Sequence, residues 1–245
     1  MLLILGLVSF VGWSISMLSG GGGALILIPL VNLLLGAQAV APVVSIGILV
    51  SNTQRTLVFW RQIDWSVVGW YSAGAIGGGV LGAYTFTQIN LAWLQIIIGL
   101  ALLLMGANYW LGSQERIFNI QTWQFLPMGF LNAFGSGLIG STGPIMNPAY
   151  LNYGLVKEEM IATKAVSGAF VHIIKIVAYS ALGALSSAYL IYGLLIGCVA
   201  IPANWLGQLA LDKMSNDQFQ QVVWTFVGLS GLLMLWGQRQ LLSLG

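Results

Sequence analysis

The hydrophobic pattern of the chain is a series of apolar stretches separated by short polar or Gly/Pro-containing breaks, and little of the chain lies outside them. A bilayer with about 30 Å of hydrocarbon is spanned by about 20 helical residues. The pattern therefore predicts an all-α polytopic membrane protein. The ten predicted membrane segments are 2–18, 24–36, 39–60, 65–86, 91–112, 122–139, 144–155, 160–184, 187–211 and 219–237.

Two of these segments, 24–36 and 144–155, are too short to cross the hydrocarbon alone. Each follows another apolar segment across a glycine-containing break, at residues 19–23 in the first case and 140–144 in the second. We therefore predict two broken helical hairpins whose breaks lie at membrane depth. In the alternative interpretation each short segment continues its neighbour, which gives eight spans.

Similar breaks in both halves of the chain indicate an internal duplication. An offset of 120 places Gly20 on Gly140, and the order of segment lengths also repeats. Each half then holds a broken hairpin and three longer segments, so residues 1–120 and 121–245 are predicted to be inverted five-segment repeats of one membrane domain. In the eight-span alternative the repeats are 4+4. Interrupted segments in corresponding positions of two repeats are typical of secondary-transporter binding sites.

The composition supports the membrane assignment and excludes other classes of protein. Of the 245 residues, 58% are hydrophobic and 6% are charged, whereas soluble domains have about 25% charged residues. A net charge of +2 without a basic run excludes a nucleic-acid partner. The single cysteine, Cys198, permits neither an intramolecular disulfide nor a cysteine metal cluster, and no cofactor motif is present.

The charges in the loops predict an orientation in the membrane. Arg61, Arg116, Lys157 and Lys213 fall on one side in this topology, and Arg239 falls on the other. By the positive-inside rule, the first side is cytoplasmic and both termini lie outside.

A glycine ridge bears on helix packing. Gly74, Gly78 and Gly82 recur at every fourth residue, and such a ridge lets another helix approach closely. We favour packing within one chain, and a homodimer contact is the alternative.

Ionisable residues inside the predicted segments are the strongest indication of a functional site, because a charge at the bilayer centre costs at least about 2.5 kcal/mol on insertion scales. Arg55, Lys164, His172 and Lys175 lie inside segments, whereas the acidic residues lie at loops or segment edges. For Lys164 snorkelling to the interface is the favoured interpretation, and for Arg55 it is the alternative. Buried positive charge without a buried carboxylate indicates a bound small anion.

The two halves of the chain supply matching candidate residues for this anion. On a helix, His172 and Lys175 share one face, as do Asn52 and Arg55, and the offset of 120 superposes the two pairs. We expect Arg55 and Lys175 to neutralise the anion, and Asn52 and His172 to orient it, in one central cavity. For His172 the alternative is an interhelical hydrogen bond.

The glycine breaks complete this predicted site. Where a helix stops and restarts, free backbone N–H groups and a positive helix end attract anions. The alternative for the first break is a flexible turn. Ser19 adds a hydroxyl, and Asn147 and Asn152 are further candidates for the cavity wall or for interhelical contacts. The predicted binding residues at the breaks are Gly20, Gly21, Gly22, Gly23, Gly140, Ser141, Thr142 and Gly143.

The two hairpins also carry motifs that resemble a known family. The first ends in residues 20–24 and Pro29 and precedes the polar pair Ser51 and Asn52, and a second copy occupies residues 140–148. In these features nearly the whole chain resembles the sulfite exporter TauE/SafE family, although the second copy has serine and threonine where the first has two glycines. The resemblance implies transport of a small sulfur-containing anion: sulfite, thiosulfate or a short organosulfonate such as sulfoacetate.

We therefore expect a secondary transporter, and not an enzyme, that works by alternating access in the bacterial cytoplasmic (inner) membrane. H⁺ or Na⁺ is the candidate coupling ion, and no metal or other cofactor is expected. An anion channel would use the same residues, and an intramembrane hydrolase would use Ser141 with His172. The half-helices favour transport, and nothing obvious in the sequence orients the histidine as a catalytic base.

Overall fold

The computed structural model describes residues 2–88, 92–111, 120–142 and 144–237, which form α-helices and two short 3-10 helices without a β-strand. The all-α prediction is therefore confirmed over this part of the chain. The α-helices are α1 (Leu2–Leu18), α2 (Ala24–Leu35), α3 (Ala37–Val58), α4 (Trp65–Gln88), α5 (Ala92–Trp110), α6 (Phe125–Ile139), α7 (Asn147–Tyr153), α8 (Lys157–Ala181), α9 (Ser187–Leu211) and α10 (Asn216–Gly237), and the 3-10 helices are η1 (Trp60–Gln62) and η2 (Thr122–Gln124).

The second short segment differs most from its predicted bounds. Segment 144–155 forms a helix of only seven residues, α7, with Pro148 in its first turn and Gly154 at φ 115° after its end. Proline is tolerated in the first turn because the N–H it lacks has no partner there, and a left-handed glycine ends a helix. The second half-helix is therefore much shorter than α2, which has 12 residues.

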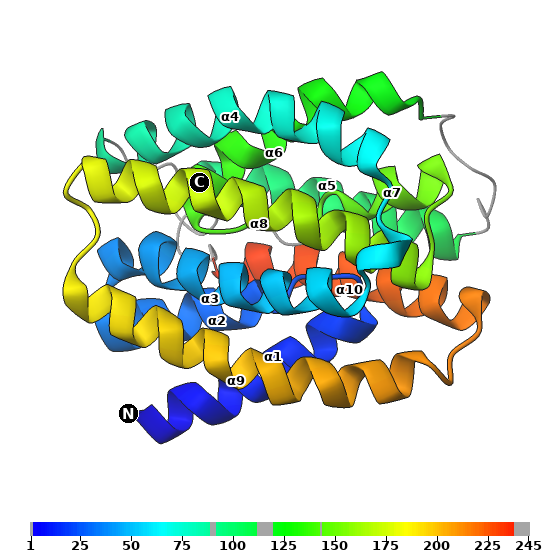
Figure 1. The fold of residues 1–245 in the computed structure, drawn as a ribbon, viewed down its shortest axis with the longest axis horizontal. Coiled ribbons are helices and arrows are strands. Elements are labelled where there is room, and N and C mark those ends of the chain that lie inside the picture. Colours follow the sequence, from blue (N-terminus) through cyan, green and yellow to red (C-terminus); the bar gives the residue numbers. More distant parts are fainter. Residues whose placement is uncertain (1, 89–91, 112–119, 143, 238–245) are drawn as a thin grey trace.

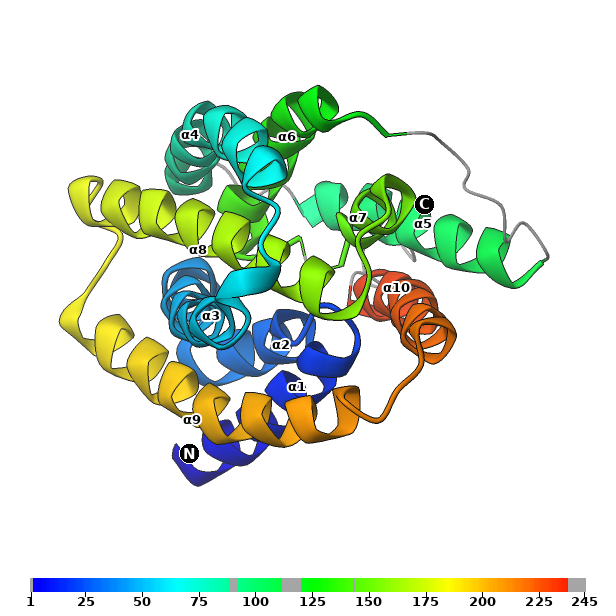
Figure 2. The same cartoon turned by 45° about the vertical axis from the view of Figure 1, so that its right-hand side comes forward.

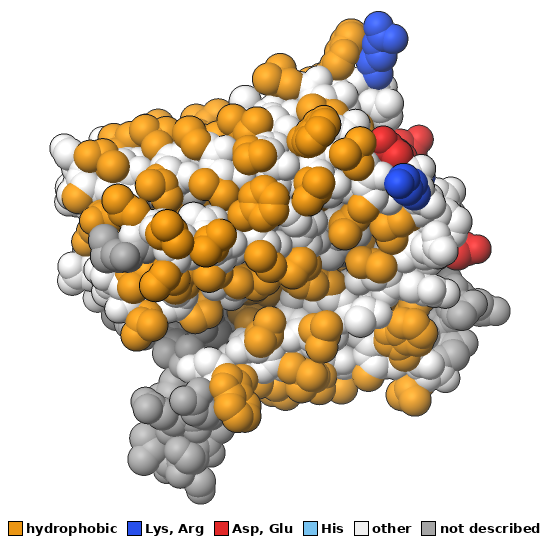
Figure 3. All heavy atoms as spheres, turned by 90° about the horizontal axis from the view of Figure 1, so that it is seen from below, with side chains coloured by type: hydrophobic (Ala, Val, Ile, Leu, Met, Phe, Trp, Pro, Cys, Tyr) orange, Lys and Arg blue, Asp and Glu red, His pale blue; other side chains and the backbone are white. Residues whose placement is uncertain are grey.

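The outer surface of the bundle is that of a membrane protein. By length and composition, α8, α9 and α10 are each able to cross a membrane, and α1, α2 and residues 96–110 of α5 are shorter apolar helices. Apolar side chains cover the lateral face in Figure 3, and charged side chains gather at one end. Lipid contacts of this kind require no polar surface, so the chain is an integral membrane protein.

The helices pack as neighbouring pairs around two central helices, α3 and α8. α4 packs along α6 at one side of the bundle, and α1 packs along α9 at the other (Figures 1 and 2). Between them, α3 contacts both α8 and α9, and α8 also contacts α4. α5 packs along α10. Arg55 on α3 and His172 on α8 are thereby brought to the interior.

The connections lie at two ends of the bundle. The α3–α4 and α9–α10 connections share one end, and the α8–α9 connection lies at the opposite end (Figure 1). Lys157 at the start of α8, Arg61 in η1 and Lys213 after α9 belong to the first end. Arg116 and Arg239 lie outside the described residues. The assignment of this end to the cytoplasm stays a prediction.

The glycine ridge on α4 forms a very close contact with α6. A Cβ atom at Gly74, Gly78 or Gly82 would lie between 1.9 and 2.4 Å from carbonyl oxygens of α6. No side chain fits at such a distance, so the two backbones approach as in other small-residue helix contacts. The ridge thus packs within the chain, as favoured from the sequence, and α6 occupies the face that a dimer contact would need.

Gly78→Ala should lower the stability of the protein. Its Cβ would lie 2.1 Å from the carbonyl oxygen of Phe130, so α4 and α6 must move apart, at a cost of about 1–3 kcal/mol. We expect a lower thermal-unfolding midpoint in detergent. Gly69→Ala is the matched control on the same helix, because no atom lies within 4 Å of its added Cβ. Equal midpoints for the two variants would contradict the close contact.

Candidate functional site

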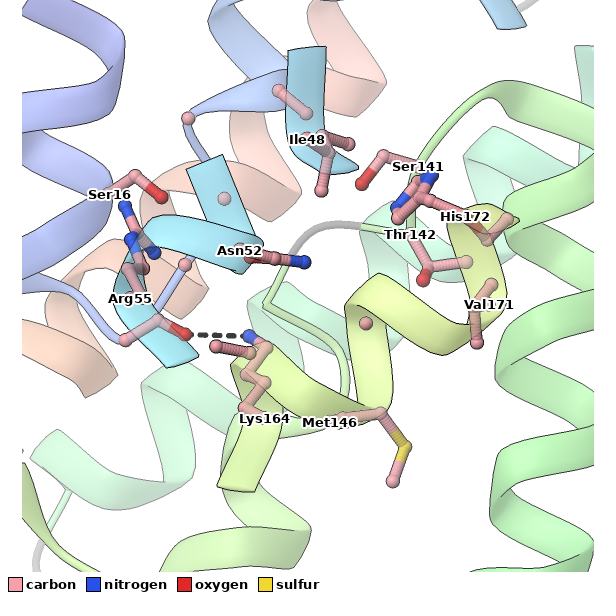
Figure 4. A pocket seen from close by; sticks show the side chains of 18 of the residues that line it. Ser16, Ile48, Asn52, Arg55, Ser141, Thr142, Met146, Lys164, Val171 and His172 are labelled. Atoms are coloured by element: carbon pink, nitrogen blue, oxygen red, sulfur yellow. Dashed lines mark hydrogen bonds between the residues drawn. The ribbon is translucent and has the colours of Figure 1, made fainter. Parts of the chain in front are cut away.

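A small cavity, here called the pocket, lies between the two glycine breaks and is lined by both breaks and by parts of α1, α3, α4, α6 and α8. Its volume is about 80 Å³, well below the roughly 300–1,000 Å³ of pockets for drug-sized ligands. A few waters or a small anion fit in this space. Figure 4 shows Arg55 and Asn52 on α3 and Lys164 and His172 on α8 around it.

The first glycine break has a backbone that only glycine adopts easily. Residues 20–22 all have positive φ, between 65° and 116°, a region that costs other L-residues about 1–2 kcal/mol each. The Gly21 amide donates to the carbonyl of Ser16 at 2.7 Å, so this predicted anion donor is already used. The amides of residues 22–24 have no partner among the described residues, and these residues line the pocket.

The hydroxyl of Ser19 does not belong to the pocket wall. Its Oγ donates to the carbonyl oxygen of Ile15 at 2.8 Å or that of Gly21 at 2.9 Å. Ser19 therefore does not line the pocket, because its hydroxyl satisfies the end of α1 and the turn that follows it.

The second break contributes side chains to the pocket. Ser141 and Thr142 line it, whereas Gly140, at φ 89°, does not, and Gly143 lies outside the described residues. Since α7 has only seven residues, it offers a much weaker helix-end dipole than predicted for this half. The two breaks are therefore unequal: the first presents backbone amides and the second presents hydroxyl-bearing side chains.

Lys175 is held by the second break and does not line the pocket. It is fully buried, and its Nζ donates to the carbonyl oxygen of Gly140 at 2.7 Å and to Ser136 Oγ at 3.0 Å. The expectation that Lys175 faces the central cavity is thus wrong, because its side chain ends behind Gly140. The contact positions the second break relative to α8.

Arg55 lines the pocket, and its guanidinium is fixed by neutral groups. It is 5% exposed, which excludes snorkelling to the interface. Nε and Nη2 donate to Asn204 Oδ1 at 3.2 and 2.8 Å, and Nη2 lies 3.5 Å from the carbonyl oxygen of Trp13. Nη1 has no partner among the described residues. Two N–H donors are therefore left for a ligand.

Lys164 also lines the pocket, which corrects the snorkelling interpretation. Its Nζ donates to the carbonyl oxygen of Gly20 at 2.7 Å and to Asn147 Oδ1. Asn147 in turn donates to the carbonyl oxygen of Ser19 at 3.0 Å. The side chain therefore points inward and holds the first break. The sequence contained a signal for this, because Lys164 falls on the same face of α8 as His172 and Lys175.

His172 and Asn52 occupy the pocket wall without hydrogen-bond partners among the described residues. His172 is 5% exposed, and its Nδ1 is buried and unpaired, so the alternative of an interhelical hydrogen bond has no support at this nitrogen. Asn52 Nδ2 lies only 2.5 Å from where a Cβ of Gly168 would be, so the absence of a side chain at Gly168 makes room for Asn52. Both residues stand where the sequence pairing placed them.

The pocket residues that the sequence did not predict include Asn132 on α6 and Tyr71 on α4. Thr142 Oγ1 donates to Asn132 Oδ1 at 2.6 Å, and Asn132 Nδ2 donates to the Tyr71 hydroxyl oxygen at 2.5 Å. Nothing in the sequence pairs α4 with α6 in this register, so these residues could not be assigned. Asn152 was considered for the wall, but it bonds to the carbonyl oxygen of Pro148 at 2.9 Å.

A small, cation-lined pocket between two broken hairpins of an apolar helical bundle is typical of membrane transport proteins. The profile of the Sulfite exporter TauE/SafE family matches residues 4–234. The chain belongs to this family of membrane transporters. No curated protein and no solved structure matches it.

Asn204→Leu should destabilise the protein by leaving the buried Arg55 guanidinium short of acceptors, at a cost of about 2 kcal/mol. Unfolding in detergent followed by circular dichroism measures this cost. Gln208→Leu, one turn later on α9, is the control, and it should have little effect. In an Arg55→Met background the cost of Asn204→Leu should shrink, because no charge is left unpaired. The same cost in both backgrounds would refute the pairing.

Proposed function

We propose that the protein is a secondary transporter of a small sulfur-containing anion: sulfite, thiosulfate or a short organosulfonate such as sulfoacetate. The observation that carries the proposal is a pocket lined by two cationic side chains, Arg55 and Lys164, with no acidic residue among its described lining. Uncompensated positive charge away from bulk water favours a bound anion. The family supplies the sulfur chemistry, and the residues supply the attraction for negative charge.

The proposed roles of the pocket residues follow from their places in its wall. Arg55 Nη1 and the amides of Gly22 and Gly23 bind the oxyanion at one wall. Asn52 and His172 orient it from another side, and Ser141 and Thr142 line the remaining wall. Lys175 and Gly140 act behind this wall and keep the second break in place.

Alternating access is supported by a second, larger cavity. It measures about 940 Å³ and is lined by Leu25 and Ile139 and by the α8–α9 connection, so it opens at the end opposite the α3–α4 connection (Figure 1). Ala24 and Ser141, close in sequence to Leu25 and Ile139, line the pocket. The two cavities are therefore lined by residues that are neighbours along the chain. We infer a state in which substrate approaches from this end, driven by an H⁺ or Na⁺ gradient.

Inverted repeats, residues 1–120 and 121–245, would provide the symmetric framework for this exchange. Replacing α1–α5 by α6–α10 maps the α4–α6 contact onto α9–α1 and the α3–α9 contact onto α8–α4, while the α3–α8 and α5–α10 contacts map onto themselves. α1 and α6 also begin at opposite ends of the bundle (Figure 1). We propose ten segments in this 5+5 arrangement and a bacterial cytoplasmic membrane as the location.

Arg55→Gln should abolish saturable uptake of radiolabelled sulfite into proteoliposomes. Losing a charged contact in a buried site costs about 2 kcal/mol or more, which corresponds to an affinity at least about 30-fold lower. Arg61→Gln, an exposed arginine at the bundle end, is the control and should transport normally. Unchanged uptake by Arg55→Gln would overturn the assignment of the pocket. Single-channel conductance in wild-type protein would show that it is an anion channel and not a transporter.

A further inference from the structure

We propose that Lys164 completes a pair of cations with Arg55 and that the pocket therefore selects doubly charged anions over singly charged ones. This inference rests on the proposed function and adds to it the charge of the substrate and the residue, Lys164, that selects for that charge. The family match assigns no role to Lys164.

The surroundings of Lys164 Nζ fit an ammonium group. The atoms it bonds, the carbonyl oxygen of Gly20 and Oδ1 of Asn147, are both acceptors. The orientation of the Asn147 amide is fixed independently, because its Nδ2 donates to the carbonyl oxygen of Ser19 at 3.0 Å. An ammonium has three donors, so one N–H remains after these two bonds. Lys164 lines the pocket, and we assign this third donor to the anion.

Arg55 provides the second positive charge on the same part of the wall. Its partners, Asn204 Oδ1 and the carbonyl oxygen of Trp13, are neutral, and Nη1 is left free in the described structure. The first break joins the two cations, since Lys164 holds the carbonyl oxygen of Gly20 and residues 20–23 line the pocket beside Arg55. Figure 4 shows both side chains at this break.

No carboxylate balances these charges within the described part of the chain. The acidic residues there lie at the start of α4, α8 and α10 and just after α9, and the one ion pair found joins Lys157 to Glu158 at a helix start. A singly charged anion would leave one buried cation uncompensated, whereas a doubly charged anion neutralises both. The charge count of the pocket therefore favours a dianion.

The other polar side chains on the wall add no permanent charge to this count. His172 is the other titratable base that lines the pocket, and its Nδ1 has no partner. Asn52, Ser141 and Thr142 are neutral. The volume of about 80 Å³ admits only a few heavy atoms. The preferred ligand is accordingly a compact dianion with both charges near α3 and the first break.

Thiosulfate and methanesulfonate test the charge selectivity, because they share an SO₃ group and differ by a charged sulfur in place of a methyl group. Their dissociation constants are measured by calorimetry at pH 6 on the purified protein in neutral detergent, at matched ionic strength. Wild-type protein should bind thiosulfate at least about tenfold more tightly. Lys164→Gln should reduce this preference to less than about threefold, and the exposed control Lys213→Gln should keep it.

Equal affinity of the two anions for wild-type protein would overturn the inference and leave the proposed function standing, as would a preference that survives Lys164→Gln. Binding of neither anion to folded wild-type protein would instead count against the proposed function. If Lys164→Gln does not fold, Lys164→Met is used to measure the same ratio of the two affinities. The comparison of the two anions on wild-type protein alone is sufficient to refute the selectivity.

Discussion

The structure depends on buried positive charges that are held by neutral dipoles. Arg55, Lys164 and Lys175 lie inside an apolar bundle, and their partners are backbone carbonyls, amide oxygens and a hydroxyl. Carbonyl dipoles offset part of the cost of burying a cation but leave its net charge in place. We propose that the resulting positive interior favours a small anion over neutral solutes. The glycine breaks make this possible, since a continuous helix would offer neither the free carbonyls nor the free amides.

α8 links the two breaks mechanically. Lys164 holds the carbonyl oxygen of Gly20 and Lys175 holds that of Gly140. The two lysines are eleven residues apart on one face of a continuous helix, which corresponds to about 16 Å along its axis, and His172 lies between them. A change in the separation of the breaks must therefore break one of these lysine contacts or move α8. We propose that this arrangement couples anion binding at the pocket to the positions of the two hairpins, as alternating access requires.

Much of the fold was readable from the sequence, because a bilayer allows few solutions. The ten apolar segments correspond to ten α-helices within the described residues, with bounds close to the predicted ones except for the short α7. The sequence also pointed to the two glycine breaks and to Arg55, Asn52 and His172, which line the pocket, because polar residues and glycine runs are conspicuous in apolar helices. Their role in binding stays a prediction. The directions of the lysine side chains were harder to predict from the sequence. Lys175 contacts the carbonyl oxygen of Gly140 outside the pocket, and Lys164 contacts that of Gly20. Tyr71 and Asn132 depend on the register of α4 against α6, which only the packing of the glycine ridge determines.

The most direct test of the account is the position of a heavy-atom anion in the protein. Selenite is a close analogue of sulfite, and the anomalous scattering of selenium locates it in a crystal of the complex. The account predicts one strong peak in the pocket, within hydrogen-bonding reach of Arg55 Nη1 and the amides of Gly22 and Gly23. Selenium bound only outside this pocket, with Arg55 and the first break uncontacted, would contradict the account.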